Sequence, residues 1–219
     1  AGKNIYKDNA YPDYRCYPSG ADTGTNINQI QSLPSSWGKV KTIGVQAFMG
    51  NALTGLPDSW GSVTTIGAES FKDNKITALT APWDTFTQIP RGAFLNNEIV
   101  SMQPSWGKIT VIGRYSFLDN RLKALPSSWG EVREIHYGAF ANNELTAIPD
   151  SWGKISILGG RERGAPISRW DPHATVFGHS TANSETKDID REKNKNNITA
   201  LPESLGNLYF IDPDTFSSN

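Results

Sequence analysis

Aromatic and aliphatic side chains recur along this chain at a fixed interval of 23 residues. Six tryptophans keep this interval: Trp37, Trp60, Trp83, Trp106, Trp129 and Trp152. In phase with them run a phenylalanine column (Phe48, Phe71, Phe94, Phe117, Phe140), an aliphatic column (Ile43, Ile66, Ile89, Ile112, Ile135, Leu158) and an asparagine column (Asn51, Asn74, Asn97, Asn120, Asn143). Several columns in phase define an internal repeat, and a period of roughly 20 to 50 residues is typical of solenoids.

The columns also predict local structure. Leu53 and its equivalents, mostly followed by Thr and then by Pro, favour one short extended segment per coil, and stacked copies predict a parallel sheet. Ile43, Ala47, Phe48 and Asn51 stand at i, i+4, i+5 and i+8, which is helical spacing, so the segment Gly-x-x-Ala-Phe predicts one helical turn on another side of the coil. The predicted fold class is therefore an α/β solenoid of about seven 23-residue coils.

The tryptophan and phenylalanine columns could form a stacking platform for bases or sugars, but they return in phase with Leu and Ile. We therefore interpret them as core. The asparagine column is interpreted as a structural ladder, because an amide supplies both a donor and an acceptor to the backbone of adjacent coils. Replacing Asn97 by alanine is expected to destabilise the array by about 1 to 3 kcal/mol.

The repeats divide the chain into an N-terminal cap (1–27), an array (28–158), an insertion (159–195) and a last repeat (196–219). Ile148 and Leu201 are 53 residues apart, one period plus 30, which reveals the insertion. We expect Phe177 to take the missing phenylalanine position and, with Trp170, to anchor the insertion. Replacing 160–195 by a short linker that restores the period is expected to leave the solenoid folded.

Composition narrows the function. The chain has 21 Lys+Arg against 22 Asp+Glu, which argues against a nucleic-acid partner held by charge. No apolar run approaches the roughly 20 residues that span a bilayer, so membrane insertion is not expected. Asp171, His173 and His179 could bind a metal, but two imidazoles in a loop are common, so neither a metal nor a cofactor is expected. Cys16 is alone and forms no disulfide framework.

Two motifs resemble a known family. The pattern Asn-x-Leu-Thr-x-Leu-Pro-x-Ser-x-Gly, clearest in NNITALPESLGNLYFI at 196–211, resembles the leucine-rich repeat. The segments IGVQAFMGN (43–51) and IGRYSFLDN (112–120) are similar to the BspA-like subfamily of bacterial surface repeats, although Asn stands where that subfamily commonly has Cys. The resemblance implies a curved, right-handed solenoid used for binding, typically of proteins, and it implies no catalytic residue.

Binding residues are expected where the sequence departs from the repeat. Arg and Tyr, which dominate binding hot spots, gather at neighbouring positions after the Ile-Gly step. These candidates are Arg91, Arg114, Tyr115 and Tyr137, with Arg133 and His136 just before. We expect them to form an exposed, mildly basic aromatic patch; the alternative is an ordinary solvated face. Trp170 and His173 of the insertion complete the candidate binding residues.

The leading hypothesis is a non-catalytic recognition module, a bacterial surface or secreted adhesin-like protein that binds a host or neighbouring-cell protein or glycan. The chain is expected to act as a monomer. Two alternatives remain: an accessory binding domain of a larger secreted enzyme, and a leucine-rich-repeat effector.

Overall fold

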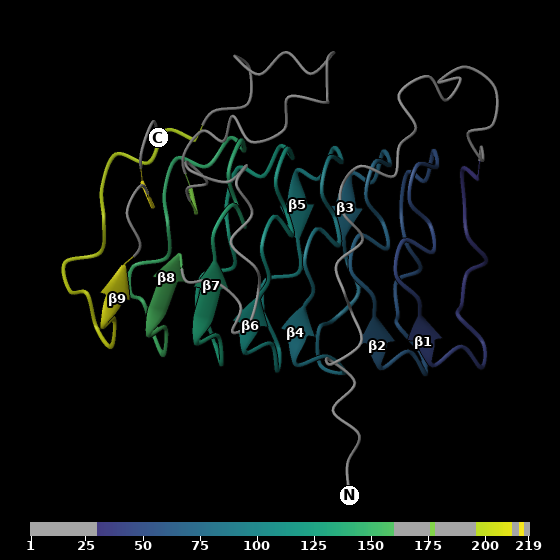
Figure 1. Cartoon of the computed structure of the whole chain (residues 1–219), viewed down its shortest axis with the longest axis horizontal. Coiled ribbons are helices and arrows are strands. Elements are labelled where there is room, and N and C mark those ends of the chain that lie inside the picture. Colours follow the sequence, from purple (N-terminus) through teal and green to yellow (C-terminus); the bar gives the residue numbers. More distant parts are fainter. Residues whose placement is uncertain (1–29, 160–175, 178–195, 212–214, 217–219) are drawn as a thin grey trace, which may run out of the picture.

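A computed structural model describes residues 30–159, 176–177, 196–211 and 215–216 of this chain. These residues form a parallel β-solenoid of about five turns with a spacing of about 23 residues (Figure 1). The described residues contain no helix, so the expected α/β character is not found in them, and the expected seven coils are not confirmed. The predicted cap and most of the predicted insertion lie outside the described residues.

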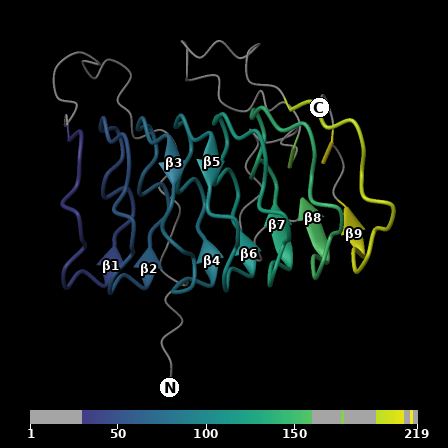
Figure 2. The same cartoon turned by 180° about the vertical axis from the view of Figure 1, so that it is seen from behind.

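Short strands lie on two sides of the coil (Figures 1 and 2). One side carries the sheet β1–β2 and the sheet β4–β6–β7–β8–β9, and the other side carries β3–β5. The bounds are β1 Thr42–Ile43, β2 Thr65–Ile66, β3 Ala78–Leu79, β4 Gln88–Ile89, β5 Ser101–Met102, β6 Val111–Ile112, β7 Glu134–His136, β8 Ile157–Gly159 and β9 Phe210–Ile211. Every pair is parallel, and the register follows the repeat: Thr42 pairs with Thr65, and Val111 with Glu134.

The main strands occupy a different part of the repeat from the predicted one. They contain the isoleucine column, whereas the sequence placed the strand at Leu53 and its equivalents. The predicted helical turn is wrong, because Gln46, Glu69 and Tyr115 each have a φ of 56°. A left-handed residue interrupts a right-handed helix. The N–H of Phe48 instead donates to the carbonyl oxygen of Ser70 in the next coil, at 2.8 Å.

Proline determines where the second sheet forms. In the first two coils, Pro34 directly follows Leu33 and Pro57 directly follows Leu56, and a proline has no N–H to donate. The third and fourth coils have Thr80 and Gln103 at this position, and these coils carry β3 and β5. The Gln103 N–H donates to the carbonyl oxygen of Leu79 at 2.8 Å. A second strand per coil therefore appears where the proline is missing.

Another proline separates the two sheets that lie on the same side of the coil, β1–β2 and β4–β6–β7–β8–β9, which together we call the main sheet. Gly67 and Gly113 each follow a strand and donate their N–H to the coil before, to Ile43 and Ile89 at 2.9 and 2.8 Å. The equivalent residue after β4 is Pro90, which has no N–H. Sheet β1–β2 therefore ends at β2, and the five-stranded sheet starts at β4.

The aromatic columns are core, as predicted. The tryptophans from Trp37 to Trp152 are at most 8% exposed. The phenylalanine rings stack along the array, with Phe71, Phe94 and Phe117 separated by centroid distances of 5.5 and 5.6 Å. Aligned rings at this separation bury large apolar surfaces and make favourable contacts with both neighbours.

The asparagine ladder is confirmed. Asn97 Oδ1 accepts the backbone N–H of Ile76 at 3.1 Å. Its Nδ2 donates to the carbonyl oxygen of Phe71 in the coil before at 2.9 Å, and also to the carbonyls of Phe94 and Leu95. One buried amide thus satisfies backbone groups of two successive coils.

Phe177 takes the missing phenylalanine position, as predicted. It is fully buried and stacks between Phe140 and Phe216 at centroid distances of 5.8 and 5.4 Å. Its carbonyl oxygen accepts a hydrogen bond from Asn196 Nδ2. Replacing all of 160–195 would therefore remove a core residue, so a linker that spares the solenoid must keep Val176 and Phe177.

Candidate functional site

The predicted Arg/Tyr residues lie in the turn that follows the main sheet. Arg91 comes two residues after β4 and Arg114 two residues after β6, and Tyr137 follows β7 directly. Because these strands pair in register, the residues after them stack in adjacent coils. The structure therefore brings the predicted residues together, but it exposes them much less than expected.

Arg91 is already paired within the molecule. Its guanidinium Nη2 lies 2.8 Å from Glu69 Oε1, and the two side chains are 15% and 7% exposed. Glu69 Oε2 also accepts a hydrogen bond from Gln46 Nε2 at 2.8 Å. Three coils are thus linked by one polar chain of Gln46, Glu69 and Arg91, and the Arg91 charge is partly neutralised.

Arg114 and Tyr137 are buried, so the prediction that they are exposed is wrong. They are 8% and 6% exposed. The Arg114 guanidinium lies 4.3 Å from the centroid of the Tyr137 ring and 5.6 Å from that of Tyr115, and it donates a hydrogen bond to the Tyr137 hydroxyl. A planar, weakly hydrated guanidinium packs well on aromatic faces, which explains its burial.

Tyr115 is half-buried and lies across the turn of the next coil. Its ring packs edge-to-face on Tyr137 at a centroid distance of 5.3 Å. A Cβ added to Gly138 would lie 2.2 Å from the Tyr115 ring. Gly138 also has a φ of 69°. Glycine is therefore required under Tyr115 both by space and by backbone conformation.

The other two candidates near Tyr137, Arg133 and His136, differ in exposure. Arg133, just before β7, is exposed. His136 is 3% exposed, and its Nε2 lies 3.2 Å from Glu134 Oε2. His136 is therefore a buried strand residue and not part of an exposed patch. Trp170 and His173 lie outside the described residues.

The exposed polar surface lies instead on the outer side of the main sheet. We call this the sheet face; its exposed members are Lys41, Thr42, Thr64, Thr65, Thr87, Gln88 and Arg133. Hydroxyl groups bond to the coil before: Thr64 Oγ1 donates to the carbonyl oxygen of Lys41 at 3.3 Å, and Thr110 Oγ1 to that of Thr87 at 3.0 Å. These bonds orient the side chains of Thr64 and of the half-buried Thr110. Thr77, outside the sheet face, makes the same kind of bond to the carbonyl oxygen of Thr54 at 3.4 Å.

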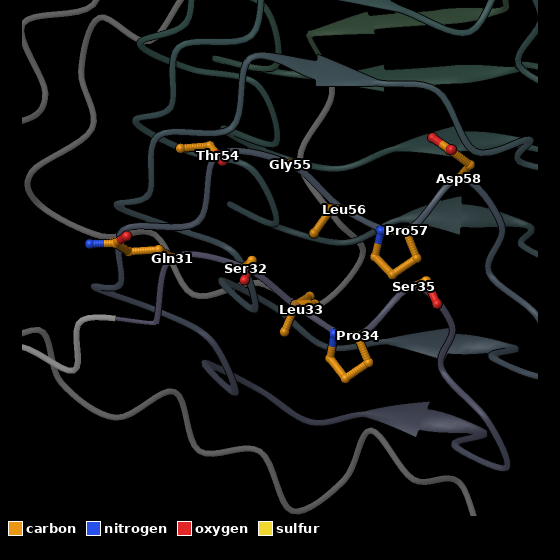
Figure 3. Close-up of a pocket in the computed structure, with 10 residues that line it drawn as sticks. All are labelled: Gln31, Ser32, Leu33, Pro34, Ser35, Thr54, Gly55, Leu56, Pro57 and Asp58. Atoms are coloured by element: carbon orange, nitrogen blue, oxygen red, sulfur yellow. The ribbon is translucent and has the colours of Figure 1, made fainter.

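A small open pocket lies on another part of the coil, between the first two coils (Figure 3). It has a volume of about 300 Å³ and is lined by the segments Gln31–Ser35 and Thr54–Asp58. Pro34 and Pro57 face it, and these are the prolines that prevent strand pairing at this position. The pocket is a result of that missing pairing, and it contains none of the predicted binding residues.

Charged pairs elsewhere on the surface follow the repeat. Arg121 Nε lies 3.1 Å from Glu144 Oε1 in the next coil. Lys154 donates a hydrogen bond to Glu131, and this bond together with the lysine charge lowers the pKa of that carboxyl. Both pairs are partly exposed and contribute little to stability. Within the described residues, no group of three or more His, Cys, Asp or Glu side chains could hold a metal ion.

Stacked coils, in-register aromatic columns and a repeated amide ladder define a solenoid repeat protein. The profile of the BspA type Leucine rich repeat region matches residues 23–149 in six copies. The match covers more than half of the chain, and the chain belongs to this family. No curated protein and no solved structure matches it. In the described part of the chain, no helix is long and apolar enough to cross a membrane.

Proposed function

We propose that this protein is a non-catalytic recognition module, displayed on or secreted from a bacterial cell, that binds a protein or glycan through its sheet face. Leucine-rich repeats are generally binding repeats, and the BspA type is typically found in surface or secreted bacterial proteins. The observation that carries the proposal is the row of exposed polar side chains that runs across successive coils on this face, in which the Thr64 hydroxyl is held by a hydrogen bond to the coil before.

A rigid row of hydroxyl groups suits recognition energetically. Binding normally costs about 0.5 to 1.5 kcal/mol for each flexible side chain that becomes ordered. Thr64 and Thr110 are already held by hydrogen bonds to the backbone of the coil before. Short β-branched side chains also have few rotamers to lose. The sheet face therefore presents donors and acceptors at a small entropic cost.

Arg133 adds a charge to this surface. It is exposed, whereas Arg91 is paired with Glu69 and Arg114 is buried against Tyr137. A guanidinium beside hydroxyl groups favours acidic glycans or carboxylate-bearing protein surfaces. An accessory domain of a larger secreted enzyme would bind its substrate through the same surface, so this alternative shares the site and differs only in the parent protein.

A charge reversal on the sheet face should reduce binding. We expect Arg133→Glu to raise the Kd for a ligand captured from host extracellular material about tenfold or more. The control is Lys123→Glu, which also reverses one exposed charge but lies one period after Val100, the residue before β5, and so outside the sheet face. Surface plasmon resonance on both variants measures the difference.

Equal loss of binding in both variants, or no loss in either, would contradict the assignment of the sheet face. A double reversal at Arg91 and Arg114 is unsuitable for this test. It would break the Glu69 ion pair and leave a carboxylate against Tyr137, so it would report on folding and not on binding.

A further inference from the structure

The outer side of the main sheet changes character along the array. Its two outward columns follow the positions of Thr64 and Thr65 in the repeat. In the first three coils these columns hold Lys41 and threonine or glutamine side chains. On and just before β8 and β9 (Figures 1 and 2) they hold Ser156, Ile157, Tyr209 and Phe210. The polar sheet face therefore ends in an apolar, aromatic surface.

The exposure of this surface follows from its outward direction, not from the end of the array. Within the described residues, no side chain of the two columns is buried, because each is exposed or half-buried in every coil. Successive coils lie side by side along the array (Figure 1), so a neighbouring coil covers the edge of a strand and leaves its outward side free. Tyr209, which is 75% exposed, therefore points outward as Thr64 and Arg133 do.

Backbone hydrogen bonds place Arg133 two coils from Tyr209. The Ser156 N–H donates to the carbonyl oxygen of Arg133 at 2.8 Å, and the Tyr209 N–H donates to that of Ser156 at 3.1 Å. The Ser156 hydroxyl donates to the same Arg133 carbonyl at 3.3 Å. Paired strands are about 4.8 Å apart, so about 10 Å separates the backbones of Arg133 and Tyr209. A guanidinium, a hydroxyl and a phenol ring thus lie in one row across three coils.

Arg133 gives this row a charge that the molecule does not neutralise. Within the described part of the chain, its guanidinium has no ion-pair partner. The nearby acids are already engaged: Glu131 accepts a hydrogen bond from Lys154, and Glu134 Oε2 lies 3.2 Å from His136 Nε2. The row therefore favours a carboxylate, although the chain as a whole has a formal charge of −1.

We propose that this surface is the binding hot spot of the protein, and that its partner is a protein surface on which a carboxylate lies beside an apolar side chain. We call the surface the aromatic end; its members are Arg133, Ser156, Ile157, Tyr209 and Phe210. The proposal rests on the proposed function, because Arg133 belongs to the sheet face, and it names the partner. Tyr and Arg are enriched at hot spots, and Phe is enriched at interfaces.

The apolar members favour a protein over an acidic glycan. Phe210 is 42% exposed, and Ile157, its partner in the β8–β9 register, is half-buried. Neither side chain can hydrogen-bond, so a sugar lying on them would lose water from its hydroxyl groups without gaining partners. An apolar side chain of a protein gains free energy in proportion to the area that it buries there. A neighbouring carboxylate completes the contact through a charge-assisted hydrogen bond to Arg133.

Peptides selected on the full chain from a random-peptide phage library are the probes for this test. We expect the selected sequences to carry Asp or Glu beside an aromatic or aliphatic residue. Tyr209→Ala and Arg133→Gln should each raise the Kd of the synthetic peptides at least about tenfold, measured by fluorescence anisotropy. Added salt should weaken binding to the unaltered chain, and it should weaken binding to Arg133→Gln less.

Val45→Ala and Lys123→Gln are the matched controls. The first shortens a side chain that is 63% exposed, and the second removes an exposed charge, both outside the sheet face. Both variants should bind the peptides as the unaltered chain does. Circular dichroism of each variant separates loss of binding from loss of folding, and Tyr209 is exposed enough that its replacement spares the core.

Several results would overturn the proposal. Peptides that lose affinity on Lys41→Gln but not on Tyr209→Ala would place the hot spot at the polar end of the sheet face and leave the proposed function standing. A hyaluronan oligosaccharide that binds more tightly than every selected peptide would indicate an acidic glycan partner, again within the proposed function. Peptides indifferent to Lys41→Gln, Arg133→Gln and Tyr209→Ala would contradict both the aromatic end and the sheet face. A library that yields no binding peptide would also overturn the proposal.

Discussion

Gly138→Ala is expected to lower the free energy of unfolding by about 2 to 4 kcal/mol. Two costs combine: a non-glycine residue at a positive φ costs about 1 to 3 kcal/mol, and the new methyl group would overlap the Tyr115 ring, 2.2 Å from its nearest carbon. To relieve the overlap, Tyr115 must leave its packing on Tyr137. Chemical denaturation followed by tryptophan fluorescence measures the change.

Gly130→Ala separates the two costs. Gly130 has a φ of 56°, but the nearest atom to an added Cβ is the Gly107 carbonyl oxygen at 3.9 Å. This control should therefore show the backbone cost without the overlap. In a Tyr115→Ala background the effect of Gly138→Ala should fall to that of Gly130→Ala. Equal effects of Gly138→Ala with and without Tyr115 would contradict the predicted contact.

The core could be predicted from the sequence because its columns are chemically simple. A position that returns every 23 residues as Trp, Phe or Ile is apolar in every coil, and burial is the one environment that favours this. The same arithmetic placed Phe177 correctly across a long insertion. The position of Phe177 in the 23-residue period was sufficient to predict its burial, because each coil must supply one ring to the continuous stack.

Strand positions could not be predicted from residue type. The Leu53 segment and the Thr65–Ile66 segment both contain residues that favour strands. The deciding factor is whether the next residues can donate an N–H, which Pro57 and Pro90 cannot. Reading these prolines as missing donors in a ladder, and not only as the ends of segments, would have located both sheets and the break between β2 and β4.

The left-handed residues also had a signal that the helical interpretation missed. The position before each ladder asparagine is Gly50, Asp73, Asn96, Asp119 or Asn142, and all five have a positive φ. Gly, Asn and Asp are the residues that best tolerate this conformation. They also form a second row of contacts: Asn96 Nδ2 donates to Asp73 Oδ1 at 2.8 Å, and Asn142 Nδ2 to Asp119 Oδ1 at 2.7 Å.

The candidate site was predicted correctly in position and wrongly in exposure. Register alone places Arg114 beside Tyr137, because β6 and β7 pair one period apart. Exposure depends on what those side chains do once they are adjacent, and Arg114 packs on the Tyr137 ring instead of pointing into solvent. Residue type predicted hot-spot chemistry, but the same chemistry also makes stable intramolecular contacts.

The second large effect is expected for Asn97→Ala, which should lower the free energy of unfolding by about 3 kcal/mol. The substitution leaves the buried N–H of Ile76 unsatisfied. It also removes the hydrogen bonds of the amide to the carbonyl oxygens of Phe71, Phe94 and Leu95, although the Phe71 carbonyl keeps the bond from Asn74 Nδ2. An unsatisfied buried group costs about 1 to 3 kcal/mol. The effect therefore lies at the upper end of the range expected from sequence.

Two further variants show whether the ladder is responsible. Asn207→Ala removes one exposed hydrogen bond, from Nδ2 to the carbonyl oxygen of Gly153, and should change stability by less than about 1 kcal/mol. Asn97→Asp keeps an acceptor for Ile76 but removes the donor to Phe71, and it buries a charge. It should therefore be no more stable than Asn97→Ala at neutral pH, and it should recover as the carboxyl is protonated in acid. An Asn97→Ala midpoint equal to that of Asn207→Ala would show that the amide ladder does not hold the coils together.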